Sequence, residues 1–311
     1  MVIRALSLVV LVGCLAVSSA QDKKEPPKKA PASVFTNATE AGPDYLIQGE
    51  YEGKLGSDKA GAQVVALGDG KFDVFLLAGG LPGAGWNAKD KVKAEAGTTD
   101  GKATLTGKFT GSLAEGKLNG KTPDGVEFSL VKVERKSPTL GAKAADGALI
   151  LFDGKNADEW AGGKIVESDL LAVGTNSKKG IGAGKLHLEF RTPFQPKARG
   201  QSRGNSGVYL HNTEIQVLDS FGLTGANNEC GAFYSRQKPE VNMCLPPLTW
   251  QTYDVELKSE GEQLLATVFH NGVKVHENFV IRKGPVKPAN IQLQNHGNPV
   301  AYRNIWFVEP K

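Results

Sequence analysis

The sequence predicts an all-β protein with two domains, a C-terminal sandwich or jelly roll and a smaller N-terminal antiparallel β domain. The 311 residues include 38 glycines without a collagen-like period, which indicates many tight turns. Short apolar runs alternate with polar residues, and no window of about 12 residues has a helical period. At roughly 100–200 residues per domain, the length predicts two domains.

Residues 1–20 have the features of a secretory signal. Arg4 supplies a positive start, residues 6–15 form an apolar run too short to span a membrane, and Ala20 ends a run of small residues suited to cleavage. Export to the periplasm or the exterior is therefore expected. Leu11-Val12-Gly13-Cys14 also resembles a lipobox, so lipid anchoring through Cys14 is the alternative.

A charged, Pro-containing stretch, residues 21–33, predicts a disordered linker. Residues 34–136 predict a small antiparallel β domain, because Asp69-Gly70 separates two short apolar runs as in a hairpin. A last strand is expected over 128–133. Further turns are predicted at Asp100-Gly101, Asn119-Gly120 and Asp124-Gly125.

Residues 137–146 are small and flexible and predict a second linker, followed by a domain over 147–311. Asn271-Gly272 predicts a type I′ hairpin within that domain. Cys230 and Cys244 remain after signal removal. In an oxidising compartment they predict a disulfide, with two free buried thiols as the alternative.

The net charge of +4 accompanies no basic stripe with interleaved aromatic residues, so no nucleic-acid partner is expected. The more informative feature is strand alternation in residues 147–311, because residues i and i+2 share one face of a strand. The predicted core face comprises Leu186, Leu188, Phe190, Val208, Leu210, Ile215, Val217, Ile291 and Leu293. The opposite face carries His187, Glu189, Arg191, Tyr209, His211, Glu214, Gln216, Gln292, Gln294 and His296. These planar hydrogen-bonding groups suit a groove that binds a saccharide, with a merely solvated sheet face as the alternative.

Several motifs in one order resemble the 3-keto-disaccharide hydrolase domain over residues 147–311. They are Leu151-Phe152-Asp153-Gly154, Leu188-Glu189-Phe190-Arg191, Asn205-Ser206-Gly207-Val208-Tyr209-Leu210, Glu214-Ile215-Gln216-Val217-Leu218-Asp219, Cys230-Gly231-Ala232-Phe233-Tyr234, Trp250-Gln251-Thr252-Tyr253-Asp254 and Leu293-Gln294-Asn295-His296-Gly297. The resemblance implies a concanavalin-like jelly roll, similar to laminarinase-type glycoside hydrolases, and an enzyme acting on 3-keto sugars by hydrolysis or elimination.

Elimination from a 3-keto sugar needs a base for the C2 hydrogen, a group that stabilises the enolate and an acid for the leaving oxygen. Glu214 is the candidate base, and His211 or His296 the candidate base or acid. Arg191 or a bound divalent metal ion would stabilise the enolate. The groups expected to orient hydroxyls are Asn205, Tyr209, Gln216 and Gln294.

Asp219 is the second candidate catalytic carboxylate, because Glu214-x-Gln216-x-x-Asp219 has the spacing of the laminarinase-type carboxylate strand with altered residues. Only a bulge would bring both carboxylates to one face, and Asp219 at a strand end could simply begin a turn. Two non-catalytic functions remain open at this point: a lectin-like carbohydrate-binding module and a cell-envelope interaction protein.

Overall fold

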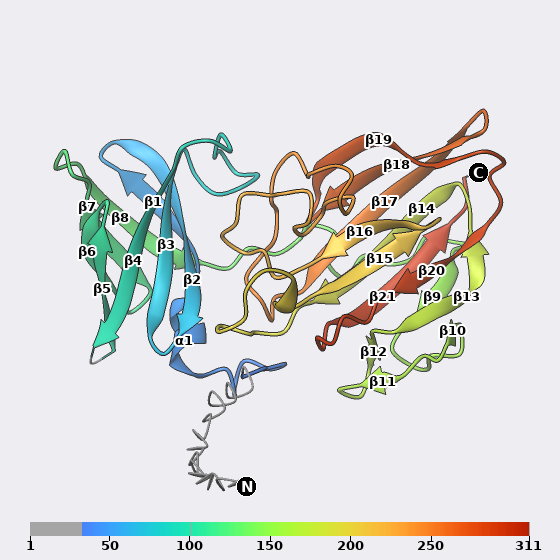
Figure 1. The fold of residues 1–311 in the computed structure, drawn as a ribbon, viewed down its shortest axis with the longest axis horizontal. Coiled ribbons are helices and arrows are strands. Elements are labelled where there is room, and N and C mark those ends of the chain that lie inside the picture. The colour runs from blue at the N-terminus through green and yellow to red at the C-terminus, as the bar shows by residue number, and fades with distance from the viewer. Residues whose placement is uncertain (1–32, 100, 311) are drawn as a thin grey trace, which may run out of the picture. The chain divides into compact units, whose positions relative to one another are not determined.

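The computed structural model describes residues 33–99 and 101–310. The predicted export signal, Cys14 and all but the last residue of the predicted linker at 21–33 lie outside the described residues. In the described part, no helix is long and apolar enough to cross a membrane. Strands dominate these residues, and the one α-helix described is the six-residue α1 (Gly42–Ile47), which confirms the all-β prediction (Figure 1).

The N-terminal domain is a closed antiparallel barrel in which each strand pairs with the next and β1 also pairs with β8. Its strands are β1 (Gly49–Leu55), β2 (Asp58–Gly68), β3 (Lys71–Ala78), β4 (Lys91–Thr99), β5 (Lys102–Gly107), β6 (Thr110–Ala114), β7 (Lys117–Lys121) and β8 (Glu127–Val133). Closure leaves no free sheet edge.

Two turn predictions in the barrel have opposite outcomes. Asp69 and Gly70 have φ of 55° and 68° and join β2 to β3, which confirms that hairpin. The prediction at Asn119-Gly120 is wrong, because both residues lie inside β7. A Cβ at Gly120 would lie 2.4 Å from the ring of buried Phe128. Gly120 is therefore required for packing rather than for a turn.

The C-terminal domain is a sandwich of two antiparallel sheets. The five-stranded sheet has the order β10 (Trp160–Ala161), β13 (Thr175–Ile181), β20 (Ala289–Leu293), β15 (Ser206–Leu210) and β16 (Thr213–Val217). The second sheet contains β9 (Leu149–Phe152), β11 (Ile165–Val166), β12 (Leu170–Ala172), β21 (Ala301–Val308), β14 (Gly184–Arg191), β17 (Gln251–Glu260), β18 (Gln263–His270) and β19 (Val273–Lys283). Asn271 and Gly272 have φ of 50° and 77° and form the predicted turn between β18 and β19.

The predicted core face is confirmed, since all nine residues assigned to it are buried in one cluster between the two sheets. Burying each aliphatic or aromatic side chain contributes roughly 1.5–3 kcal/mol. Because these side chains point inward, their neighbours along each strand must point outward. The sandwich core thereby determines which residues are presented on its two outer faces.

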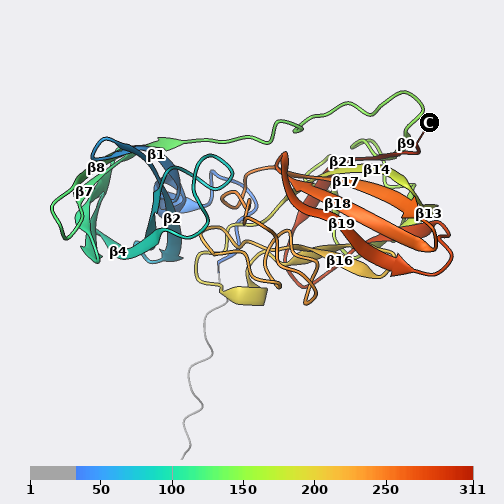
Figure 2. The ribbon, with the colours of Figure 1, turned by 90° about the horizontal axis from the view of Figure 1, so that it is seen from above.

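Residues 137–142, part of the predicted flexible linker, are bonded along the outer face of β14, β17 and β21 (Figure 2). We call this segment the strap. The Thr139 hydroxyl donates to Asp254 Oδ2 at 2.6 Å, and the Gly141 N–H donates to Glu189 Oε1 at 2.6 Å. These bonds satisfy polar groups that the strap itself helps to bury.

The strap covers an ionic cluster centred on β14. His187 Nδ1 lies 2.8 Å from Asp254 Oδ1, and Arg303 Nε donates to Glu189 Oε2 at 2.7 Å. Burial opposes the charge of Glu189, but hydrogen bonds from His187, Asn304, Gly141 and Arg303 outweigh it and lower the pKa of Glu189 to about 2. This carboxylate is thus held ionised by its donors.

The cluster predicts a specific acid dependence of stability. Because the pKa of folded Glu189 lies below its ordinary value of 4.5, its contribution is present above about pH 4.5 and is lost as the pH falls toward 2. Glu189→Gln should be less stable than wild type at pH 7 and lose less stability between pH 5 and 2, as measured by denaturant unfolding. Glu256→Gln, which changes an exposed carboxylate on β17 of the same sheet, is the control and should follow wild type. Parallel pH curves for wild type and Glu189→Gln would contradict the assignment.

Candidate functional site

The single polar face expected from strand alternation is divided between two sheets. β14 belongs to the eight-stranded sheet, whereas β15, β16 and β20 belong to the five-stranded sheet. Arg191 therefore lies on the outer face opposite to Glu214. Its guanidinium donates to Glu167 Oε2 at 2.7 Å and covers the ring of Trp250. The role of enolate stabiliser expected for Arg191 is a misassignment, because a two-residue period distinguishes inward from outward but not one sheet from the other.

Glu214 is the centre of the polar group on the five-stranded sheet. It lies directly across from Tyr209 in the β15–β16 pairing, and the Tyr209 phenol donates to Glu214 Oε2 at 2.8 Å. Gln294 Nε2 in turn donates to the Tyr209 phenol oxygen at 3.3 Å. Three of the predicted site residues are therefore brought into one hydrogen-bonded chain.

Gly207 gives the Glu214 carboxyl its place on the sheet. Gly207 is paired with Gln216, two positions along from the Tyr209–Glu214 pair and therefore on the same face of the sheet. A Cβ on Gly207 would lie 2.1 Å from Glu214 Oε1, so the carboxyl occupies the space that any other residue would fill. The glycine is needed here for close approach rather than for backbone conformation.

Gln216 completes the enclosure of the carboxyl. With its amide nitrogen turned toward the site, Gln216 lies 3.0 Å from Glu214 Oε1 and 3.0 Å from the Ser206 carbonyl. Gln201, in the short helix η1 (Gly200–Ser202), lies 2.9 Å from the other end of this amide, and its backbone carbonyl accepts from Asn205 Nδ2 at 2.8 Å. Asn205 thus lies at the margin of the group and orients Gln201.

The electrostatics of Glu214 differ from those of an ordinary surface carboxylate. It is 8% exposed, and burial raises its pKa despite the hydrogen bond from Tyr209 and the interaction with nearby His296. Burial and the bond to Glu214 also raise the pKa of Tyr209, so the phenol keeps its proton. The arrangement supplies a carboxyl whose pKa is raised above its ordinary value, beside a fixed O–H donor.

His296 is the one predicted histidine that interacts with Glu214. It follows β20 and is exposed. His211 lies instead at the tip of the β15–β16 hairpin with φ of 49°, and its Nε2 lies 3.2 Å from the Ile181 carbonyl oxygen. Burial lowers the pKa of His211. These contacts describe a structural turn residue.

Asp219 follows the end of β16 and forms a buried ion pair. Arg203 Nε donates to Asp219 Oδ2 at 2.6 Å, and both side chains are buried. Asp219 also accepts from the Phe221 N–H, as expected at the start of a turn. The predicted pair of carboxylates therefore comprises one lightly bonded group, Glu214, and one group neutralised by arginine.

The predicted disulfide is not formed. Cys230 and Cys244 are free thiols, both buried in the sandwich core, which corresponds to the alternative considered above. The Cys230 sulfur lies 3.2 Å from the Tyr253 phenol oxygen, and that phenol donates to the Gln216 carbonyl at 2.6 Å. The thiols are part of the packing behind β16.

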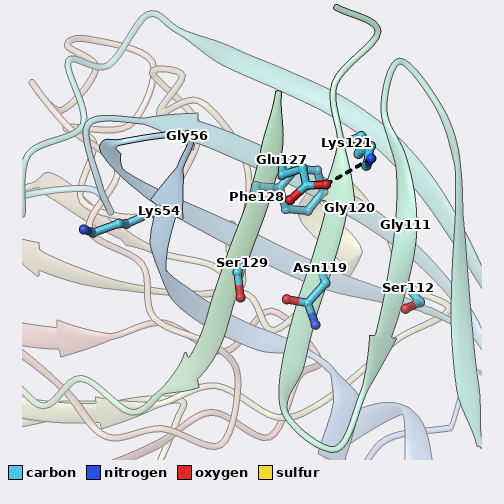
Figure 3. A pocket seen from close by; sticks show the side chains of 10 residues that line it. All are labelled: Lys54, Gly56, Gly111, Ser112, Asn119, Gly120, Lys121, Glu127, Phe128 and Ser129. Atoms are coloured by element: carbon cyan, nitrogen blue, oxygen red, sulfur yellow. Dashed lines mark ion pairs between the residues drawn. The ribbon is translucent and has the colours of Figure 1, made fainter. Parts of the chain in front are cut away.

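No residue set can be assigned to the predicted divalent metal, since the described residues contain no group of three or more His, Cys, Asp or Glu side chains arranged to bind one. A hollow of about 700 Å³ lies on the barrel, where Ser112, Asn119 and Ser129 stand side by side (Figure 3). Its acidic group, Glu127, is paired with Lys121 at 3.0 Å and is exposed. This hollow lacks the buried titratable group that distinguishes the Glu214 site.

Three residues of the site were missed as functional residues. Gly207 and Tyr234 stood within the quoted motifs, but alternation assigns no role to a glycine or to a residue outside a strand. Gln201 belongs to a three-residue helix and carries no periodic signal. Tyr234 lies on a loop whose residue Phe233 bridges to Ile215, beside Glu214.

The close contact at Gly207 gives a direct structural prediction. Gly207→Ala should displace the Glu214 carboxyl and break its bond to Tyr209, because the new methyl group would overlap Oε1. Overpacking of this kind typically costs about 1–3 kcal/mol. A crystal structure and a denaturant titration of the variant measure both effects. Gly97→Ala in strand β4, where no atom lies within 4 Å of the new Cβ, is the control. An unmoved Glu214 would contradict the proposed role of Gly207.

Comparison with solved structures finds two that are similar to about half of the chain. Two crystal structures of candidate glycosyl hydrolases from Parabacteroides distasonis ATCC 8503 are similar to part of the chain. One has 26% identity and a TM-score of 0.47, covering 53% of this chain and 84% of that one. The other has 19% identity and a TM-score of 0.41, covering 53% and 95%. Comparison with curated proteins gives no match.

The family assignment comes from the sandwich domain. Residues 147–308, about half of the chain, match the family described as the 3-keto-alpha-glucoside-1,2-lyase-like domain. These residues include every side chain of the Glu214 site. The match confirms the resemblance inferred from the motifs. The chain therefore belongs to the carbohydrate-active family of 3-keto-alpha-glucoside-1,2-lyase-like domains.

Proposed function

We propose that this protein cleaves 3-keto-glycosides by elimination, with Glu214 as the general base. The observation that carries the proposal is the position of one buried carboxyl, with a raised pKa, between the Tyr209 phenol and the gap left by Gly207. A base of this kind is most effective when its pKa lies close to the working pH. The family match supports the 3-keto-glycoside as substrate class.

In the proposed reaction, the C3 ketone acidifies the hydrogen at C2. The Glu214 carboxylate takes this proton, and the electron pair of the C–H bond forms an enolate. When the C3 carbonyl forms again, the C1=C2 double bond forms and the bond from C1 to its oxygen substituent breaks. The leaving oxygen takes up a proton. The products are an enone sugar and the free alcohol. Addition of water to the enone would give 3-keto-glucose, so the net result of both steps is hydrolysis.

The neighbouring groups have distinct roles in this proposal. Tyr209 keeps its proton and, with the Gln216 amide, orients the carboxyl, while the second N–H of Gln294 supplies a donor for the enolate oxygen. His296, exposed beside Glu214, is the candidate donor of the proton to the leaving oxygen. Export directed by residues 1–20 would place this reaction outside the cytoplasm.

The ion pair of Asp219 with Arg203 favours elimination over a retaining glycosidase mechanism. A retaining enzyme needs two carboxyl groups about 5–5.5 Å apart, one of them a free nucleophile. Asp219 is instead bound to Arg203. Non-catalytic saccharide binding is the second candidate function. It is favoured by the exposed aromatic ring of Tyr234, whose backbone N–H donates to the Glu214 carbonyl.

The proposal is tested with 3-keto-trehalose as substrate and Glu214→Gln as variant. Wild type should release the enone or 3-keto-glucose, and loss of the base should lower kcat by about 10²–10⁴-fold. Because Glu214 acts in its ionised form, kcat/KM of wild type should rise with pH through a pKa above the ordinary 4.5. Mass spectrometry and ultraviolet absorbance of the enone follow the products.

Two controls accompany this experiment. Glu256→Gln replaces an exposed carboxylate on the other sheet and should keep wild-type activity. Arg191→Gln should also keep it, because Arg191 lies on the opposite outer face. Full activity of Glu214→Gln would overturn the assignment of the base. Binding without turnover by wild type would favour the saccharide-binding function.

A further inference from the structure

We propose that Tyr234 forms an aglycone subsite, a stacking surface for the second pyranose ring of a disaccharide substrate. This inference rests on the proposed function and names the substrate class more closely. The Tyr234 side chain is 37% exposed, although the residues immediately before it are buried. Exposed aromatic rings on a fixed backbone are a common feature of recognition surfaces.

The position of Tyr234 follows from backbone pairing. Phe233 bridges to Ile215 in antiparallel register, and the Tyr234 N–H donates to the Glu214 carbonyl at 3.1 Å. Tyr234 is thus opposite Glu214, as Tyr209 is on the other side. Neighbouring strands lie about 4.8 Å apart, so Tyr234, Glu214 and Tyr209 form one outward-facing row about two strand spacings long. That span fits a disaccharide with one of its two rings on each side of the carboxyl.

The loop holds Tyr234 firmly. Phe233 is buried and stacks on Phe279 with ring centroids 4.2 Å apart. Arg236 covers the same ring of Phe279 and donates to the Thr213 hydroxyl at 2.9 Å. The Ser235 N–H donates to the Asn227 carbonyl at 2.8 Å. Because the loop is ordered in advance, binding on Tyr234 requires little additional ordering.

The row is chemically asymmetric about Glu214. Beyond Tyr209, the next residue in register is Gln292, followed by Asn176 on β13, and both are exposed amides. The aromatic ring is on the opposite side of Glu214. A keto sugar ring presents a carbonyl and hydroxyls that need directional hydrogen bonds, which the amide side supplies. An ordinary pyranose presents a face of C–H groups, which fits an aromatic ring. The leaving ring is therefore assigned to Tyr234.

The ring assignment is tested by comparing two substrates with each variant. Methyl 3-keto-α-glucoside has no second ring, whereas 3-keto-trehalose has one. Tyr234→Ala should raise KM for 3-keto-trehalose by about fivefold to tenfold and change kcat/KM for the methyl glycoside by less than about twofold. Tyr234→Phe, which keeps the ring, should behave like wild type. Leu223→Ala changes an exposed apolar residue of the same connection between β16 and β17 and should have no effect.

An equal effect of Tyr234→Ala on both substrates, or no effect on 3-keto-trehalose, would overturn the inference while leaving the proposed function intact. If wild type converts neither substrate, the proposed function fails instead. Titration with trehalose, which lacks the ketone and cannot undergo the elimination, then tests the stacking surface separately. Weaker binding of trehalose by Tyr234→Ala than by wild type or Tyr234→Phe would support the subsite. Equal binding would contradict it.

Discussion

Burial of one apolar face of each sheet against the other is the interaction on which the sandwich and its site both depend. Leu188 on β14 and Ile215 on β16 are completely buried in the same core, although they belong to different sheets. Strand alternation then forces the residues beside them to opposite exteriors. This packing decides which groups share a site. A substitution in the core would therefore affect the site through strand position rather than through direct contact.

Two buried glutamates on the two outer faces show how surroundings divide one residue type between two roles. Glu189 accepts hydrogen bonds from Gly141, Asn304 and Arg303, and these donors hold its pKa far below normal. Glu214 is also buried, but its close donors are neutral, so burial prevails and its pKa is raised. The first is a structural anion under the strap. The second has the environment of a group that exchanges protons.

The sequence predicted the all-β fold class, two hairpin turns, the core face and the family, because each of these depends on a local pattern or on motifs in a fixed order. It also named Glu214, Tyr209, Gln216 and Gln294 as one group. It was wrong about Arg191, since the sheet to which a strand belongs is decided by pairing between distant segments. The turn predicted at Asn119-Gly120 was wrong for a related reason. A glycine beneath a cross-strand aromatic ring has the same local signature as a glycine in a turn.

The sequence by itself determined which side chains face inward and which residue types are available outside, because strand geometry is local. The tertiary structure alone decided that Asp219 would be neutralised by Arg203, that the strap would cover His187 and Glu189, and that Cys230 and Cys244 would be packed as thiols. It also placed Tyr234 opposite Glu214. Each of these contacts joins segments that are distant along the chain, and no periodic pattern in the sequence marks them. Only packing in the folded protein brings them together.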